Sequence, residues 1–276
     1  MPNLTPIIPD HGVFHALPHP LLSPFINQYT FRSIVIPTDC YVEKAMPLRL
    51  TSSIDFFIGD AFDTIDCLSG EVLPFLRATV RGPRTFKKYH IRLQGQFISF
   101  TIKFHATGIY KLLGMPMDKL RDKALSGSSI PALPFEKMTT QLLYARDIKT
   151  CIDIVEPCLL QLASRYLPVA SVAEQAVRHL LLHNGRATVA QLANNSNLSI
   201  RQLERIFAKE IGVSPKTYSR MLRFLHLLNN KTARPNQKWT ALAHDANYFD
   251  QMHLVKEFKQ FLGTTPSAYV PADFAF

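Results

Sequence analysis

The feature that most constrains this sequence is an internal repeat near its C-terminus. Five residues recur with the same identity and order at a constant separation of 51 positions. They are Leu203, Phe207, Gly212, Pro215 and Tyr218 in the first copy, and Leu254, Phe258, Gly263, Pro266 and Tyr269 in the second. Repeats are considered before any other fold assignment, because a repeated unit determines the architecture of its whole segment.

Each copy has the pattern of a helix-turn-helix unit. Leu203 and Phe207 are four residues apart and form a buried stripe on the second helix of the first copy. Gly212 is then placed to end that helix, and Pro215 to begin the next one. Upstream, Leu192-Ala193 recurs as Leu242-Ala243, which places a short first helix in each copy. The second helix of such a unit can lie in the DNA major groove.

Helix start and stop signals occur throughout residues 171–276. Three capping boxes are predicted, in which a hydroxyl group and a side chain three residues later satisfy free amide donors. They are Ser171 with Glu174, Thr188 with Gln191, and Ser199 with Gln202. Ser214-Pro215 and Thr265-Pro266 each place a capping residue before a first-turn proline, and Gly185 is placed to end a helix. This segment is therefore expected to be entirely helical.

The candidate DNA contacts lie opposite the buried stripe of each second helix. They are Arg201, Gln202, Glu204 and Arg205 in the first unit, and Gln251, Met252, His253, Val255, Lys256 and Lys259 in the second. Arg201 or Arg205 could bond guanine, Glu204 could accept from cytosine, and Gln251 could read adenine. The two lysines are expected at phosphates, and Met252 and Val255 at thymine methyl groups. The alternative is a solvated charged stripe.

Composition and charge agree with a protein that binds a polyanion. The chain of 276 residues carries a formal net charge of +10, with 47% hydrophobic and 19% charged residues. Residues 171–276 have a net charge of +6, against +4 for the longer remainder. The first residues lack the pattern of a signal peptide, and no apolar run is long enough to span a membrane. We therefore expect a cytoplasmic protein without membrane contacts.

The first half favours strands and is expected to form a β-rich module. Residues 96–104 alternate apolar and mostly polar side chains, and residues 53–58 and 89–93 are shorter candidates. A helix is expected over 108–114, and a longer helical stretch over 138–166 that Pro157 breaks or kinks. The predicted organisation is a β-rich sensor domain at 1–135, linker or dimerisation helices at 136–170, and a DNA-binding domain at 171–276.

Residues 171–276 resemble the DNA-binding domain of the AraC/XylS family of bacterial transcription regulators. The most specific part runs from Trp239 through Asn247-Tyr248, Glu257-Phe258-Lys259 and Gly263-Thr-Thr-Pro266 to Tyr269. The resemblance implies two helix-turn-helix units joined by a long helix at about 214–230. Two departures occur: Asn247 replaces a usual glycine, although asparagine also adopts the left-handed conformation, and Val270 replaces a frequent arginine.

Residues 102–113 are similar to a stretch near the end of the sensor domain in some family members. This similarity implies a cupin-like barrel followed by helices, and hence an α+β protein with an all-α second domain. Such a domain would bind a small-molecule effector or form a homodimer, and an activator would also contact RNA polymerase. The expected partner in every case is double-stranded DNA.

Other functions are weighed against this one. No P-loop, dinucleotide-binding glycine pattern or nucleophile elbow is present, and neither an enzymatic activity nor a cofactor is expected. His11, His15 and His19 recur every four residues, and His179 and His183 are four apart, but no third ligand of matching geometry is evident and the four cysteines form no CxxC pair, so no metal site is predicted. Two alternatives remain: an enzyme or ligand-binding barrel fused to a DNA-targeting domain, and a non-specific basic nucleic-acid binder. The repeat argues against the second, because electrostatic binding alone needs no such architecture.

Overall fold

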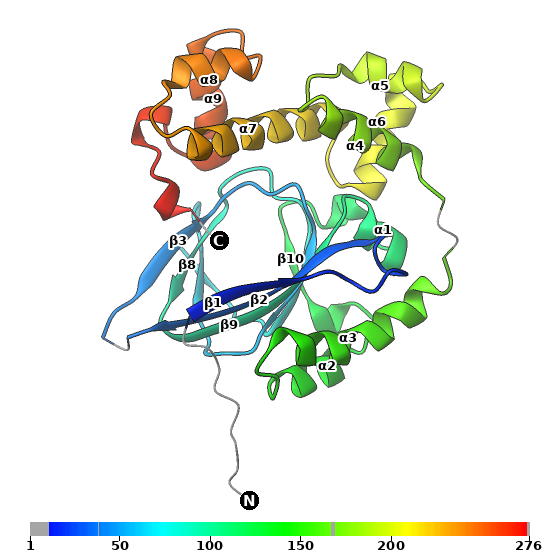
Figure 1. Cartoon of the computed structure of the whole chain (residues 1–276), viewed down its shortest axis with the longest axis vertical. Helices are drawn as coiled ribbons and strands as arrows, with labels where there is room; N and C mark the ends of the chain where they lie inside the picture. Colours follow the sequence, from blue (N-terminus) through cyan, green and yellow to red (C-terminus); the bar gives the residue numbers. More distant parts are fainter. Residues whose placement is uncertain (1–10, 38, 167–168, 275–276) are drawn as a thin grey trace, which may run out of the picture.

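The computed structural model describes residues 11–37, 39–166 and 169–274 of the chain. A β-rich N-terminal part is followed by a helical C-terminal part, which lies across one end of the β-rich part (Figure 1). The predicted α+β class is confirmed.

The strands form two antiparallel sheets. The first has the order β1-β2-β9-β4-β7-β10, with strands His11–Ala16, Ile26–Ile36, Gly95–Phe104, Ser53–Phe57, Ala78–Arg81 and Ala124–Ser126. The second has the order β3-β8-β5-β6, with strands Val42–Met46, Tyr89–Leu93, Asp63–Asp66 and Val72–Leu73. The strands predicted at 96–104, 53–58 and 89–93 are β9, β4 and β8.

The long strand β9 has two buried faces. Ile98, Phe100, Ile102 and Phe104 pack in one core cluster with residues of the helices α1 (Gly108–Leu113), α2 (Phe135–Leu142) and α3 (Ile148–Ala163). The alternate residues Ser99, Thr101 and Lys103 line a cavity between the two sheets. The polar face of this strand therefore faces the interior of the β-rich part and not solvent.

The helical stretch predicted at 138–166 is divided, but not at Pro157. Pro157 lies inside α3, and the break falls between α2 and α3. The side chain of Asp147 accepts a hydrogen bond from the Thr150 amide at 2.8 Å and so defines the start of α3. A proline removes one hydrogen bond of a helix without always ending it. The domain limits at 1–135, 136–170 and 171–276 stay a prediction.

Six α-helices make up the described C-terminal part, and four of them, α4 to α7, begin at the predicted start signals. They are α4 (Val172–Leu182), α5 (Val189–Asn195), α6 (Ile200–Glu210), α7 (Pro215–Ala233), α8 (Trp239–Asp245) and α9 (Gln251–Leu262). The capping boxes predicted at Ser171, Thr188 and Ser199 are confirmed. In Figure 1, α7 spans the domain, with α4–α6 toward one end and α8–α9 toward the other.

One predicted helix start is wrong. Thr265 makes no side-chain cap, and Pro266 begins only a three-residue 3-10 turn, η3 (Pro266–Ala268). The chain is instead directed toward the β-rich part, where Phe274 forms a parallel bridge with Ala45 of β3. Tyr269 packs against Trp239 with ring centroids 5.9 Å apart, so the segment is fixed by tertiary contacts and not by helix formation.

Candidate nucleic-acid interface

The two helix-turn-helix units have the same turn conformation. Asn197, between α5 and α6, has a φ of 53°, and Asn247, between α8 and α9, has a φ of 59°. Asparagine is among the few residues besides glycine that adopt this left-handed conformation at low cost. The expectation that Asn247 adopts the left-handed conformation of a turn glycine is therefore confirmed. Asn197 adopts the same conformation in the first unit.

The repeated residues orient the second helix of each unit. Leu203 and Phe207 of α6, and Leu254 and Phe258 of α9, are fully buried in the core of the helical domain. Gly212 and Gly263 follow these helices with positive φ, and Pro215 and Pro266 are buried in the next element. Because one stripe of each helix is fixed in the core, the opposite stripe faces outward.

The exposed stripe of α6 carries the four residues predicted to contact DNA: Arg201, Gln202, Glu204 and Arg205. The Oε1 atom of Gln202 accepts a hydrogen bond from the Ser199 amide at 2.9 Å and completes the capping box. Only the amide nitrogen of Gln202 is then left for a base. The other three side chains are on the surface, so the structure brings them together as one face.

The corresponding stripe of α9 is less uniform. Gln251, Met252, Lys256 and Lys259 are exposed, and Val255 is partly buried. His253 turns toward the protein instead: its ring packs on Tyr248 at 5.2 Å, and its Nε2 atom lies 3.6 Å from a carboxylate oxygen of Glu257. The structure thus separates His253 from the other five predicted contacts of this helix.

The charged side chains of both faces remain available to a ligand. Within the described part of the chain, Arg201, Arg205, Lys256 and Lys259 form no ion pair with a carboxylate. Unpaired cations at the surface are well suited to phosphate and guanine contacts.

Phe249 is an exposed residue that sequence reasoning did not select. It lies in the turn before α9, next to the helix that begins with Gln251, and 93% of its surface is exposed. A phenylalanine this exposed is unusual beside a predicted binding face, because its apolar surface is left in water. No signal in the sequence distinguishes it from the buried Tyr248 that precedes it.

A buried carboxylate stabilises the second unit, and the sequence analysis also missed it. Glu257 of α9 is 1% exposed and accepts hydrogen bonds from Arg220 Nε at 2.8 Å and from the Tyr248 hydroxyl at 2.6 Å. Burial and the neighbouring Glu257 carboxylate raise the pKa of Tyr248. The network joins α7, α9 and the turn between α8 and α9. Its signal was the position of Glu257 on the same stripe as Leu254 and Phe258.

Trp239, the histidine pair at the C-terminal end of α4 and Cys151 make structural contacts and form no further site among the described residues. Trp239 packs edge-on against Phe258 at 5.0 Å, next to the core of the helical domain. The rings of His179 and His183 stack at 4.2 Å, and the described residues contain no cluster of three or more potential metal ligands. Cys151 is buried, which raises the pKa of its thiol to about 12.

Two exposed helix faces, each held by a helix-turn-helix unit and joined by one helix, define a DNA-binding protein. Residues 192–271 match a family model described as a helix-turn-helix domain. This region is a helix-turn-helix domain of the AraC type, which confirms the resemblance to the AraC/XylS family. Proteins of this class bind DNA and act in transcription regulation.

Solved structures also resemble the chain at low identity. ToxT from Vibrio cholerae O395 is 8% identical, with a TM-score of 0.45, and the match covers 87% of this chain and 96% of ToxT. The AraC-like transcriptional activator CuxR is 17% identical, with a TM-score of 0.27 and coverage of 78% and 86%. No curated protein gives a significant match. None of the described helices is both long and apolar enough to cross a membrane.

Proposed function

We propose that this protein is a sequence-specific transcription regulator that reads two adjacent major-groove segments with α6 and α9. The observation that carries the proposal is that one continuous helix, α7, joins the two units. Its 19 residues correspond to about 28 Å at ~1.5 Å per residue. Successive major-groove segments on one face of B-DNA are ~34 Å apart, which two units at this separation could reach with their own side chains.

The exposed residues suggest different tasks for the two helices. The α6 face carries Arg201, Glu204 and Arg205, whose forked or acceptor groups suit base edges. The α9 face carries Lys256 and Lys259, which suit phosphates, with Gln251 and Met252 at its N-terminal end. We therefore assign most of the base reading to α6 and much of the positioning to α9.

We further propose that the β-rich part controls DNA binding, because it contacts the first unit, the helix α4 before it and the segment that follows the second unit. Lys111 of α1 forms an ion pair with Glu174 of α4, at 2.5 Å and with the lysine side chain almost fully buried. Lys209 of α6 lies over the ring of Tyr110, 5.5 Å from its centroid. Near the other unit, the side chain of Lys44 in β3 donates to the Ala272 carbonyl. A conformational change in the β-rich part would therefore change the contacts that hold the helical domain in place at both of its ends.

The backbones of the two parts also lie close together at Gly212. It has a φ of 92°, and a Cβ atom built there would lie 2.6 Å from the carbonyl oxygen of Met117 in the turn η1 (Met117–Lys119). Any side chain at residue 212 would push the two parts away from each other.

A homodimer stays a prediction. The helix α3 buries Cys151, Val155 and Leu159 in the core of the β-rich part. Only its outer face is then available to a second copy of the chain.

The proposal is tested by selecting fragments of the source genome with the full-length protein, followed by titration of the selected site at near-physiological salt. We expect two short sequence blocks about one helical turn apart, and a preference over scrambled DNA of about a thousandfold or more. Selection of no preferred sequence, with weak binding that salt abolishes, would contradict sequence-specific regulation.

A further inference from the structure

Two adjoining cavities lie between the sheets of the β-rich part. Their volumes are about 280 Å³ and 450 Å³, and Arg49, Phe57, Phe62, Arg81 and Arg84 line both. Cavities in this size range bind small organic molecules in many proteins. The shared lining makes them two parts of one site, away from the proposed DNA-contacting faces of α6 and α9.

The cavity walls carry a large excess of positive charge. Six cationic side chains line them: Arg32, Arg49, Arg81, Arg84, Lys103 and Lys123. Asp55 is the carboxylate placed among them: it pairs with Arg81 at 3.5 Å and accepts hydrogen bonds from Ser53 at 2.6 Å and Thr101 at 2.8 Å. Asp122, at the other end, is occupied by the amide and hydroxyl of Thr85. The chain's own carboxylates therefore leave most of this charge unbalanced.

Two of these cations each have a side-chain nitrogen without a hydrogen-bond partner in the described part of the chain. The Nε atoms of Arg32 and Arg49 are buried and unpartnered among the described residues. A buried polar group without a partner destabilises a fold by about 1–3 kcal/mol, and more when it is charged. Such an arrangement persists when a ligand supplies the missing acceptors.

The pKa values of the arginines in the cavity wall agree with a site that binds an anion. Burial lowers the pKa of Arg84 to about 9, with further lowering by Arg49 and Arg81. Burial likewise lowers the pKa of Arg49 to about 10, partly opposed by Asp55. Guanidinium groups are normally charged far above neutral pH. Burial is the largest cause of both shifts and the neighbouring guanidinium groups add to it, so the charged form of each arginine is disfavoured at this site.

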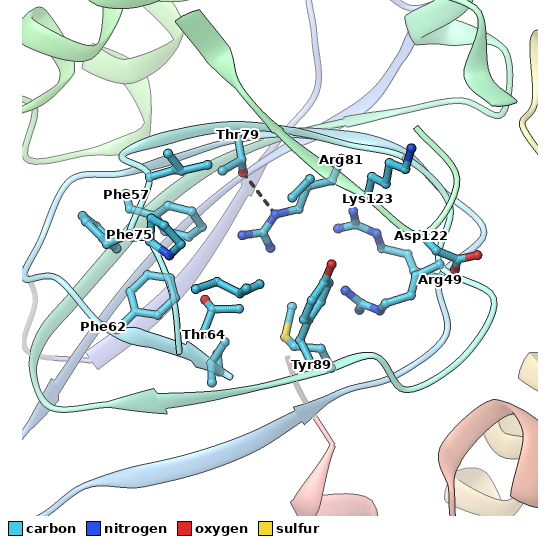
Figure 2. A pocket seen from close by; sticks show the side chains of 18 residues that line it. Arg49, Phe57, Phe62, Thr64, Phe75, Thr79, Arg81, Tyr89, Asp122 and Lys123 are labelled. Carbon is cyan, nitrogen blue, oxygen red and sulfur yellow. Dashed lines mark hydrogen bonds between the residues drawn. The ribbon is translucent and has the colours of Figure 1, made fainter. Parts of the chain in front are cut away.

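The other side of the same cavity is aromatic. The rings of Phe57 and Phe62 are 4.9 Å apart, and those of Phe62 and Phe75 are 5.3 Å apart. Figure 2 shows these three side chains on one side of the cavity, with Arg49 and Arg81 pointing into it from the other. A ligand that fills this space needs a charged end and an apolar body.

We propose that the cavity binds an organic anion, whose carboxylate or phosphate group lies among Arg49, Arg81 and Arg84 and whose apolar body lies among Phe57, Phe62 and Phe75. The proposal deepens the effector control proposed above, because it gives the chemical class of the effector. Arginine suits this task, since its planar fork donates two parallel hydrogen bonds to either oxyanion.

The position of Arg49 links this site to the helical domain. The Arg49 amide donates to the Arg84 carbonyl, and the Arg84 amide donates to the Arg49 carbonyl, both at 2.8 Å. The residues on either side of Arg49, Leu48 and Leu50, are buried in the core cluster of the C-terminal helices. An anion that moves Arg49 would therefore move two side chains within the core of the DNA-binding domain.

The test is calorimetric titration of the full-length protein, without DNA, using four probes. They are 4-phenylbutyrate, the phosphate monoester of 4-phenylbutanol, 4-phenylbutanol itself, and inorganic phosphate. We expect one or both organic anions to bind at least tenfold more tightly than the neutral alcohol and than inorganic phosphate. The two organic anions show whether the site takes a carboxylate or a phosphate group.

Arg49→Gln is the informative variant, and Arg92→Gln is its matched control, because Arg92 lies on β8 with its side chain exposed and paired with Glu43. We expect Arg49→Gln to weaken anion binding at least tenfold and Arg92→Gln to leave it unchanged. The melting temperature of ligand-free Arg49→Gln should equal or exceed that of the unaltered protein, because repulsion is relieved. A structural role for Arg49 would lower it.

The proposal is overturned if the alcohol binds as tightly as the organic anions, if Arg49→Gln binds them normally, or if no probe binds at millimolar concentration. Since no DNA is present, failure of the regulator proposal would leave these results unchanged. Failure of anion binding would equally leave the selection of a DNA site unaffected.

Discussion

The two helix-turn-helix units share a backbone plan but are stabilised differently. In the first unit, both helices begin with reciprocal capping boxes, at Thr188 and Ser199. In the second, Lys238 precedes α8 without any side-chain cap, and Asp250 caps α9 without a reciprocal partner. The second unit has the buried Glu257 network instead, whereas the equivalent residue of the first, 51 positions earlier, is Ile206.

This difference shows that the same turn geometry can be stabilised by residues next to it in the sequence or by residues from another helix of the domain. Caps satisfy the free amides of a helix from residues next to it in sequence. The Glu257 carboxylate acts across the domain, because Arg220 belongs to α7 and Tyr248 to the turn before α9. The first unit should therefore depend little on α7 for its internal order, and the second should depend on it strongly.

The largest predicted effect is the loss of the Glu257 carboxylate. Glu257→Ala leaves Arg220 without its acidic partner and the Tyr248 hydroxyl without an acceptor, and should lower the free energy of unfolding by about 3 kcal/mol or more. Urea denaturation of the full-length chain measures this. Glu204→Ala, an exposed position in the first unit, should change stability by less than ~0.5 kcal/mol. Equal losses for the two variants would remove the distinction between the units.

The next effect separates the tasks of the two contacting helices. Arg205→Ala on α6 should weaken binding to the cognate site by about 1–3 kcal/mol and leave binding to scrambled DNA nearly unchanged. Lys256→Ala on α9 should weaken both and reduce the slope of log affinity against log salt by about 0.9. Titrations at several salt concentrations give both quantities. Equal losses on both DNAs for Arg205→Ala would reassign it to the phosphate backbone.

The smallest effect supplies the cap that the second unit lacks. Lys238→Ser gives α8 an N-cap side chain comparable to Thr188 and should raise the free energy of unfolding by about 0.5 kcal/mol. Thr188→Ala, the reciprocal control in the first unit, should lower it by about 1 kcal/mol. Thermal and urea unfolding both resolve these changes. If Lys238→Ser lowers stability, the start of α8 depends on contacts of Lys238 and not on capping.

The helical domain could be predicted almost entirely from the sequence, because its signals are local. Capping residues such as Ser171 and Ser214 define helix starts, and the repeat locates the buried stripes. The prediction failed at Thr265-Pro266, where the same local signal occurs but packing of Tyr269 on Trp239 directs the chain elsewhere. Local signals therefore hold only where tertiary contacts do not compete.

The cavity in the β-rich part could not be predicted, because its residues come together only through sheet pairing. Alternation along β9 correctly identified a strand, but polar residues such as Thr101 and Lys103 are normally assigned to solvent. Arg49 and Arg84 lie in short irregular segments that pair with each other across 35 positions. No spacing rule brings such residues into one site.

The most direct test of the central claim is to change the distance between the two blocks of the selected DNA site. Inserting five base pairs rotates one major-groove segment to the opposite face of the duplex, and inserting ten moves it about one turn further away. Because one helix, α7, joins the two units, we predict that both insertions reduce affinity to that of a site with a single intact block. Affinity that is unchanged by either insertion would contradict simultaneous reading by α6 and α9.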